Sequence, residues 1–245
     1  MKTFRHIILA LTALILASCA VDEFWDGSDY TEGEEVVMTF RPKFEDFEAV
    51  TKAIGDGFNV NELVYEVWKT ENGKVSDLLN TNSVRLYQKT APMVRQGDQQ
   101  RTTISLNLVQ DQEYTILFWA QNAEADAYVT DELTKVTYSK NISSGDYISN
   151  REDMAAFYGV DFVSDGDPKA KTVYLKRPFA QLNIGTNDYA ASTNAGYTPK
   201  YSRVKVSNIY KTLNLWDGTV ADDQSVEFAC AKIPTSETFP VDGYE

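Results

Sequence analysis

Apolar and polar residues alternate with a period of two along most of the chain after residue 35. In VVMTFR (36–41), Val36, Met38 and Phe40 would share one face of an extended strand. Pro42 comes next, and we expect it to end this strand because proline has no N–H to donate to a sheet ladder. The period of two predicts β-strands as the main elements of the fold.

Two later regions carry stronger strand signals. LVYEVWKT (63–70) leads into Asn72-Gly73, a strong two-residue hairpin signal. ISLNLV (104–109) alternates, whereas YTILFWA (114–120) is apolar on both faces, which is typical of a central strand. The short link between Val109 and Glu113 predicts a hairpin between these two strands.

Further strand signals follow, and only one helix signal stands out. The strand runs lie at Val84–Tyr87, Thr134–Tyr138, Thr172–Leu175, Phe179–Ile184, Val204–Val206, Thr212–Trp216 and Val226–Ala231. Ser149 and Glu152 match a capping box, and Gly159 would end one short helix near residues 149–158. The pattern predicts an all-β protein, an antiparallel β-sandwich of Greek-key or transthyretin-like type.

The strand signals divide the chain unequally. Residues 36–178 hold enough of them for an N-terminal β-sandwich. Residues 179–245 hold fewer and end without a clear closing strand, so we expect the start of a second β-sandwich, cut from a longer chain. The alternative is one large domain whose last strands join the first sheet.

The N-terminus reads as an export signal. Lys2 and Arg5 precede an uncharged run, Ile7–Ala17, that is shorter than the roughly 20 apolar residues of a membrane span. Such a run fits residues 1–18 as a secretory signal peptide. Its end, LASC (16–19), resembles the lipobox of bacterial lipoproteins, which implies cleavage between Ser18 and Cys19 and acylation of Cys19. An ordinary secretory signal with an incidental cysteine is the alternative.

An acidic segment follows the predicted cleavage site. It contains seven acids and no base, at Asp22, Glu23, Asp26, Asp29, Glu32, Glu34 and Glu35. Its charges repel one another and favour an extended, solvated chain, so residues 19–35 predict a tether between lipid and domain. Acids just after a lipidated cysteine also resemble the surface-export signals of lipoproteins in some Gram-negative gut and oral bacteria.

Charge and residue usage exclude several classes of function. The formal net charge is −13, whereas a nucleic-acid-binding protein needs a basic face. The same charge argues against electrostatic docking on anionic lipid headgroups. The one histidine, His6, lies in the predicted signal, so the mature chain lacks the imidazole of Ser-His-Asp, Cys-His and most zinc sites. Cys230, in the alternating run SVEFACAKI, is expected to be a buried core residue.

Carboxylate chemistry leaves no clear candidate site. Acids are so numerous that pairs occur by chance, and no pair stands out for glycoside hydrolysis. Ser164–Pro168 (SDGDP) is the best calcium candidate, but it lacks the ligand spacing of a calcium-binding hand and predicts a plain turn. We therefore expect no cofactor, no metal and no enzymatic activity.

Five segments carry a family resemblance: TKAIGDG (51–57), YEVWKTENG (65–73), YTILFWAQN (114–122), VYLKRPFAQLNIG (173–185) and LNLWDGTV (213–220). Together they resemble the fimbrillin-like surface lipoproteins of Gram-negative gut and oral bacteria, which are related to the type V pilins. The resemblance implies a lipid-anchored protein of the outer membrane and cell surface that supports adhesion. It implies that other pilus subunits are its partners, joined by strand addition, and that the two sandwiches meet at Arg177-Pro178.

Family pilins lose their lipid and first strand to a protease that cuts after a basic residue. Here the first base after the tether is Arg41, and the following Pro42 resists trypsin-like cleavage. Lys43 and Lys52 come next, and neither is clearly placed, so no maturation site is assigned. The resemblance therefore leaves a stalk subunit, an anchor and an accessory subunit open.

A surface glycan-binding lipoprotein is the alternative function. Its motivation is the aromatic content of 12%, including the tryptophans Trp25, Trp68, Trp119 and Trp216, because sugars stack on exposed rings. Trp68 and Trp119 lie in predicted strands, where packing is the more ordinary role.

Overall fold

A computed structural model describes residues 35–44, 57–70, 83–96, 99–139, 152–164, 166–179, 188–197 and 200–232. The chain divides into two compact units, residues 1–33 and 34–245, and every described residue belongs to the second. The described part of this unit is built mainly from β-strands, which form three sheets, here called A, B and C. The predicted all-β fold is confirmed.

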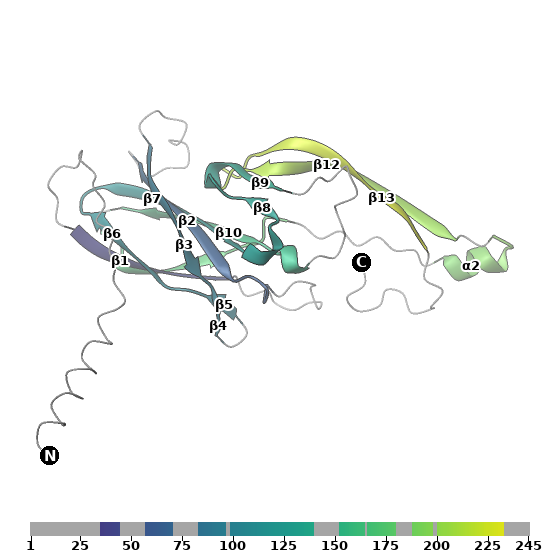
Figure 1. Cartoon of the computed structure of the whole chain (residues 1–245), viewed down its shortest axis with the longest axis horizontal. Coiled ribbons are helices and arrows are strands. Elements are labelled where there is room, and N and C mark those ends of the chain that lie inside the picture. The colour runs from purple at the N-terminus through teal and green to yellow at the C-terminus, as the bar shows by residue number, and fades with distance from the viewer. Residues whose placement is uncertain are drawn as a thin grey trace, which may run out of the picture. The chain divides into compact units, whose positions relative to one another are not determined.

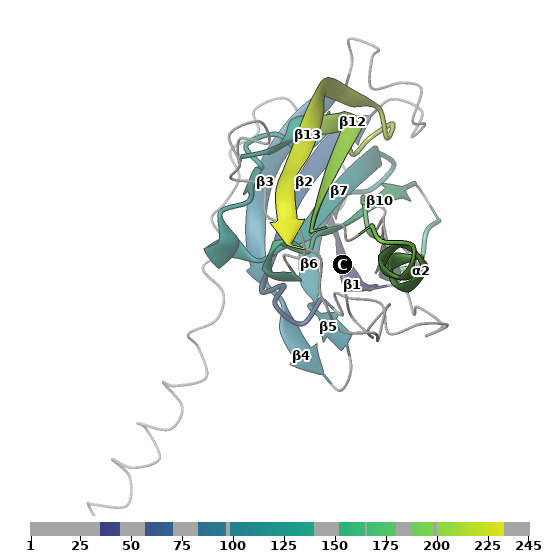
Figure 2. The same cartoon turned by 90° about the vertical axis from the view of Figure 1, so that its right-hand side faces the viewer.

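Sheets A and B contain most of the strands (Figure 1). Sheet A runs in the order β11 (Ala170–Leu175), β1 (Glu35–Phe44), β5 (Gln99–Arg101) and β4 (Val94–Gln96), and β6 (Ile104–Val109) also pairs with β1. Sheet B runs in the order β10 (Phe157–Val163), β7 (Glu113–Gln121), β2 (Glu62–Thr70) and β3 (Val84–Pro92), which Figure 2 shows side by side. All these pairings are antiparallel except that of β1 with β11, which is parallel.

The main core lies between sheets A and B, where the alternating apolar side chains of each sheet meet. Sheet A contributes Phe40, Ile104, Leu106, Leu108, Val173 and Leu175. Sheet B contributes Leu63, Tyr65, Val67, Tyr114, Ile116, Phe118, Ala120, Phe157 and Val163. The two sheets therefore form the sandwich that the period-two pattern predicted.

A second core covers the opposite face of sheet B. Val64, Leu117 and Trp119 point into it from the sheet, and Leu133, Val136, Leu215 and Trp216 close it from outside. These covering residues come from the 3-10 turn η3 (Leu133–Lys135), from β9 (Val136–Tyr138) and from the turn after β12 (Tyr201–Leu213). β7 is thus a central strand that is buried on both faces, as its apolar run predicted.

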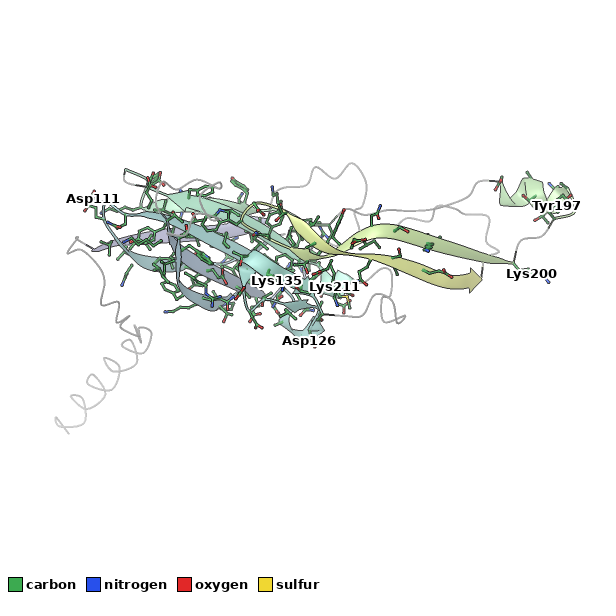
Figure 3. All side chains as sticks on the ribbon, turned by 90° about the horizontal axis from the view of Figure 1, so that it is seen from above. Asp111, Asp126, Lys135, Tyr197, Lys200 and Lys211 are labelled. Carbon is green, nitrogen blue, oxygen red and sulfur yellow. The ribbon has the colours of Figure 1, made fainter. Side chains whose placement is uncertain are left out.

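Sheet C carries this second cover and extends it. Its order is β13 (Val220–Lys232), β12, β9 and β8 (Tyr128–Val129), and β9 pairs with β12 only at Thr212 and Leu213. Figure 3 places Lys135 and Lys211 near this junction and Lys200 at the far end of the β12–β13 hairpin. Between those ends β12 pairs only with β13 among the described residues.

The predicted hairpin between residues 104–109 and 114–120 is wrong. β6 pairs with β1 in sheet A, whereas β7 pairs with β2 and β10 in sheet B. The link between them therefore crosses from one sheet to the other. The Tyr114 hydroxyl accepts a hydrogen bond from Val109 N at 3.0 Å, which holds the crossing in place. A short link allows either geometry, and here β2 and β10 occupy both edges of β7, which leaves no edge for β6.

The predicted end of β1 at Pro42 is also wrong, because the strand continues to Phe44 beside β11. Thr39 donates its N–H toward β11, to Lys169 O at 2.8 Å, so the backbone groups of Pro42 face the other side. There Pro42 O accepts from Thr102 N at 3.4 Å, in the gap between β6 and β5. The missing proline N–H therefore falls where the ladder is already interrupted.

The region of the predicted helix near 149–158 contains one 3-10 turn, η5 (Glu152–Met154), among its described residues. β10 begins at Phe157, where the helix was expected to continue, because Phe157 is 1% exposed and belongs to the main core. A short helix that the sequence did not predict, α2 (Tyr189–Asn194), precedes β12. The hairpin turn at Asn72-Gly73 and most of the run Phe179–Ile184 lie outside the described residues.

Candidate functional site

β1 occupies an internal position in sheet A, although it is the first described strand of the chain (Figure 1). β11 lies parallel to it from Thr39 to Phe44, and β6 lies antiparallel to it from Glu35 to Phe40. We call the space between β11 and β6 the β1 slot. The strand that fills this slot is paired with β6 in its first half and with β11 in its second half, and with both at Thr39 and Phe40.

The inward side chains of β1 fill the floor of the slot. Phe40 is 0% exposed, and its ring centroid lies 6.2 Å from that of Phe118 in β7. Pro42, two residues further along β1, is also buried. Complete burial of a phenylalanine side chain stabilises a fold by about 1.5–3 kcal/mol. A chain that lost β1 would therefore expose an apolar groove with unpaired backbone along both walls.

Arg41, the first candidate for maturation, lies in the middle of β1. Its side chain is exposed, opposite Thr172 of β11, while its backbone belongs to a paired strand. Cleavage there would cut through the element that fills the slot. Lys43, the second candidate, lies two residues further along the same strand, and Lys52 lies outside the described residues.

The predicted site residues at the N-terminus lie outside the described residues. These are the lipidation site Cys19 and the cleavage position between Ser18 and Cys19. The side chain of Cys230, expected in the core, is also outside them, although its backbone belongs to β13. No helix in the described part of the chain is long and apolar enough to cross a membrane.

The carboxylate of Glu66 in β2 joins several elements through hydrogen bonds. Its side chain is fully buried on the face of sheet B that the second core covers. It accepts hydrogen bonds from Trp68 Nε1 at 2.9 Å, Arg85 Nη1 at 3.1 Å, Gln88 Nε2 at 3.3 Å and Leu133 N at 3.0 Å. A buried carboxylate needs such donors, because an unpaired charge is costly away from water.

These bonds fasten the segment 130–133 to sheet B. Arg85 also donates to Asp131 O at 3.0 Å, and Gln88 donates to Thr130 O at 2.6 Å. Trp68 in turn meets Trp216, with ring centroids 5.8 Å apart in an edge-to-face arrangement. The Glu66 cluster is therefore a structural joint between sheet B and its outer cover, with its acceptors already occupied.

Two of the four tryptophans proposed for glycan stacking are buried. Trp119 is 1% and Trp216 is 2% exposed, and Trp119 donates to Gln121 Oε1 at 3.0 Å within sheet B. Trp68 is half-buried against Trp216, and Trp25 lies outside the described residues. Trp119 and Trp216 therefore act in packing, as expected of aromatic residues in strands and their turns.

The calcium candidate at 164–168 contains a turn. Asp167 N donates to Ser164 O at 3.2 Å, and the Asp167 carboxylate accepts from Ser164 N at 3.1 Å. Lys171 Nζ lies 3.2 Å from Asp167 Oδ2 and 2.9 Å from Asp161 Oδ2. Burial raises the pKa of Asp161 above its usual value, while the Lys171 ammonium acts in the opposite direction. The described ranges contain no group of three or more His, Cys, Asp or Glu side chains that could hold a metal ion.

Comparison with known proteins gives a family. A model described as "Family of unknown function (DUF6562)" matches residues 29–243. The chain belongs to this family. No curated protein matches it.

Two solved structures are similar to this DUF6562 chain. One is a fimbrial assembly protein from Parabacteroides distasonis ATCC 8503, with 14% identity over 84% of this chain and 76% of that chain, at a TM-score of 0.34. The other is the fimbrial anchor protein Mfa2 from Porphyromonas gingivalis, with 13% identity over 79% of this chain and 66% of that chain, at a TM-score of 0.40.

In this DUF6562 chain the junction segment KRPF (176–179) packs across β10 and β8. Lys176 and Tyr158 form a backbone bridge, with N–O distances of 2.8 and 2.9 Å. Arg177 lies 4.8 Å from the ring centroid of Phe157, and Phe179 stacks on Tyr128 at 5.9 Å. After β11 of sheet A, the segment therefore contacts β10 of sheet B and β8 of sheet C. The predicted boundary at residue 178 remains a prediction.

Sequence reasoning missed the Glu66 cluster and the parallel pairing of β1. The one signal for Glu66 was an acid within the apolar run LVYEVW (63–68), where a strand buried on both faces has no solvated position. The partner of β1 carried no local signal, because β11 lies more than a hundred residues away in the sequence.

Proposed function

We propose that the chain is a subunit of a surface fimbria, acting as a structural, anchor or accessory subunit that joins other subunits by β-strand exchange. The observation that carries the proposal is the β1 slot: the first strand of the sandwich lies between β11 and β6 and contributes a fully buried phenylalanine. A strand of another subunit that enters such a slot would gain backbone hydrogen bonds for affinity and side-chain pockets for register.

The proposal includes an anchor at the outer membrane through lipid on Cys19. What supports it is the lipobox-like LASC sequence and the acidic, solvated segment between Cys19 and β1. Several acyl chains on one residue would hold the protein stably at a membrane, where one chain alone binds marginally. A role in assembly, not catalysis, also fits the Glu66 cluster, which is buried and fully engaged in joining elements.

A disulfide lock tests strand exchange. Thr39 and Ala170 face one another in the β1–β11 ladder, so Thr39→Cys with Ala170→Cys, in a Cys230→Ser background, would hold β1 in its own slot. If subunits join by exchange at this slot, cells with the wild-type chain should give a ladder of heat-sensitive oligomers on unheated denaturing gels. Oxidised cells with the double-cysteine variant should lose this ladder, and reduction before assembly should restore it. Each single cysteine variant is the matched control. An unchanged ladder in the locked variant rejects exchange at β1.

The lipid anchor has a separate test. Radioactive palmitate should label the wild-type chain, and Cys19→Ala should abolish the label and leave the precursor uncut. Cys230→Ala is the matched control and should keep both. Labelling that persists in the Cys19 variant would contradict the lipidation proposal. It would have no bearing on the strand-exchange proposal.

A further inference from the structure

The outer face of sheet A differs in charge from the rest of the chain. The segments 37–43, 101–109 and 170–176 supply this face, and their outward positions hold four basic residues, Arg41, Lys43, Arg101 and Lys176, and no acid. The whole chain contains 36 acidic and 23 basic residues. The average composition, which argued against an anionic partner, therefore conceals a local basic surface.

The strand register places three of these bases together. Phe40 and Val173 point into the main core, so their neighbours in β1 and β11 point outward. Lys43 lies between Tyr174 of β11 and Arg101 of β5 in one cross-strand row. Arg41 lies on the same side of β1, about 7 Å along the strand. We call Arg41, Lys43, Arg101 and Tyr174 the basic face.

The side chains of the basic face are accessible. Tyr174 is 51% exposed, and Arg41 and Arg101 are also exposed. Lys43 is half-buried because its ammonium lies 4.6 Å from the ring centroid of Tyr174. Within the described residues no carboxylate forms an ion pair with these three bases. In contrast, Lys171 of β11 is engaged by Asp161 and Asp167 on the other side of the strand.

The residue types of the basic face, and the residues around it, suit a protein as the binding partner. Tyrosine and arginine are enriched in protein interfaces, where they combine apolar area with hydrogen bonding. The other outward positions include the uncharged Thr172, Ser105 and Asn107 and, directly after β11, the exposed Lys176. Such a surface suits an extended chain that carries negative charge.

We propose that the basic face binds the acidic run, here residues 22–34, of a second copy of this chain. That run contains six acids and no base, which makes it the complement of the basic face in charge. Fully extended, it reaches about 45 Å, more than enough to cross the face. Because the two surfaces differ, the contact is head-to-tail and links copies into a row. It rests on the proposed function only in that a subunit meets further copies of itself.

Charge exchange between two variants tests this contact. The protein is the mature chain from Ala20, made without lipid, and its self-association is measured by sedimentation at increasing concentration. Reversing the face (Arg41→Glu, Lys43→Glu, Arg101→Glu) or the run (Asp26→Lys, Asp29→Lys, Glu32→Lys) should each weaken association about tenfold or more. Mixing the two reversed variants should restore association between them, because each again meets its complement.

The control reverses three bases away from the face, Lys135, Lys200 and Lys205, which are exposed and give the same change in net charge. Circular dichroism and thermal melting must match the wild type for every variant. A wild-type chain that stays monomeric at all concentrations overturns the proposal, as does a face reversal no stronger than the control. Neither result affects the disulfide-lock test, because oligomers joined by strand exchange survive a denaturing gel and salt-dependent contacts do not.

Discussion

The carboxylate of Glu66 accepts a hydrogen bond at 3.0 Å from the backbone N–H of Leu133, 67 residues further along the chain. One fully buried group thereby connects the middle of sheet B with the 3-10 turn that covers it. The bond makes the outer cover part of the same folding unit as the sandwich.

Replacement of Glu66 tests that role. Glu66→Gln keeps the shape of the side chain but turns one acceptor into a donor. Because Arg85, Gln88 and Leu133 N–H all donate to Oε1, the amide oxygen stays there and the new NH2 group faces Trp68 Nε1. We expect the free energy of unfolding to fall by about 2 kcal/mol in urea denaturation. Amide exchange at 130–138 should accelerate more than in the main core. Glu132→Gln, an exposed neighbour, should stay within about 0.5 kcal/mol, and equal effects of both variants would contradict the prediction.

Gly159 of β10 marks a close approach of β11. A Cβ atom there would lie 2.8 Å from Leu175 Cδ2 and 3.3 Å from Val173 Cγ1. Gly159→Ala should therefore destabilise the fold by about 1–3 kcal/mol through overpacking, measured by urea denaturation. Leu175→Ala alone should cost about 2–5 kcal/mol. The double variant should lose less than both single losses together, because the shortened side chain makes room, whereas simple additivity would show that no clash exists.

Asp161 gives a pH dependence with a defined sign. Its pKa in the folded chain is raised, chiefly by burial, so the folded state holds the proton to higher pH than the unfolded state does. Its contribution to stability is full below the unfolded pKa and is lost as pH rises through the folded pKa. Asp161→Asn should therefore gain stability relative to the wild type as pH rises from strongly acidic to neutral, in urea denaturation series. A difference that is constant with pH, or that falls, would contradict this.

Arg41 should resist proteolysis because of β1 pairing as well as because of Pro42. In the native chain, Pro42→Ala should leave the peptide bond after Arg41 uncut by trypsin, since a protease needs extended, unpaired backbone. After urea unfolding the variant should be cut there and the wild type should not. Mass spectrometry of the fragments distinguishes the cases. Rapid cleavage of the native variant would show that β1 leaves its slot readily.

The sequence predicted what depends on local alternation and failed where distant partners decide. The apolar pattern of 114–120 predicted a central strand, because a strand buried on both faces has no polar positions to spare. The link at 109–113 was misread, because the same short turn serves a hairpin or a crossing between sheets. Pro42 was misread because the interruption opposite it comes from the junction of β6 and β5, which no property of residues 36–42 reveals.

The candidate site was predicted only in part. Arg41 and Pro42 drew attention from the sequence, but their place inside a slot follows from the pairing of β1 with β11. The basic face stayed hidden because its four residues come from three strands, β1, β5 and β11, that are separate in the sequence and adjacent only in the sheet. The Glu66 cluster was missed for the same reason, since the four donors to its carboxylate come from four different positions between residues 68 and 133.

The parallel pairing of the first and the last described strands of sheet A, β1 and β11, also has a consequence for folding. During synthesis β1 is made first and its partner β11 only about 130 residues later. Long-range parallel pairing forms slowly, because the entropic cost of closing a large loop comes before the hydrogen bonds of the ladder can form. The nascent chain therefore passes through a stage in which β1 has no partner in β11 and the wall of its slot is missing. A chaperone that recognises unpaired, alternating strands would find its substrate in that interval.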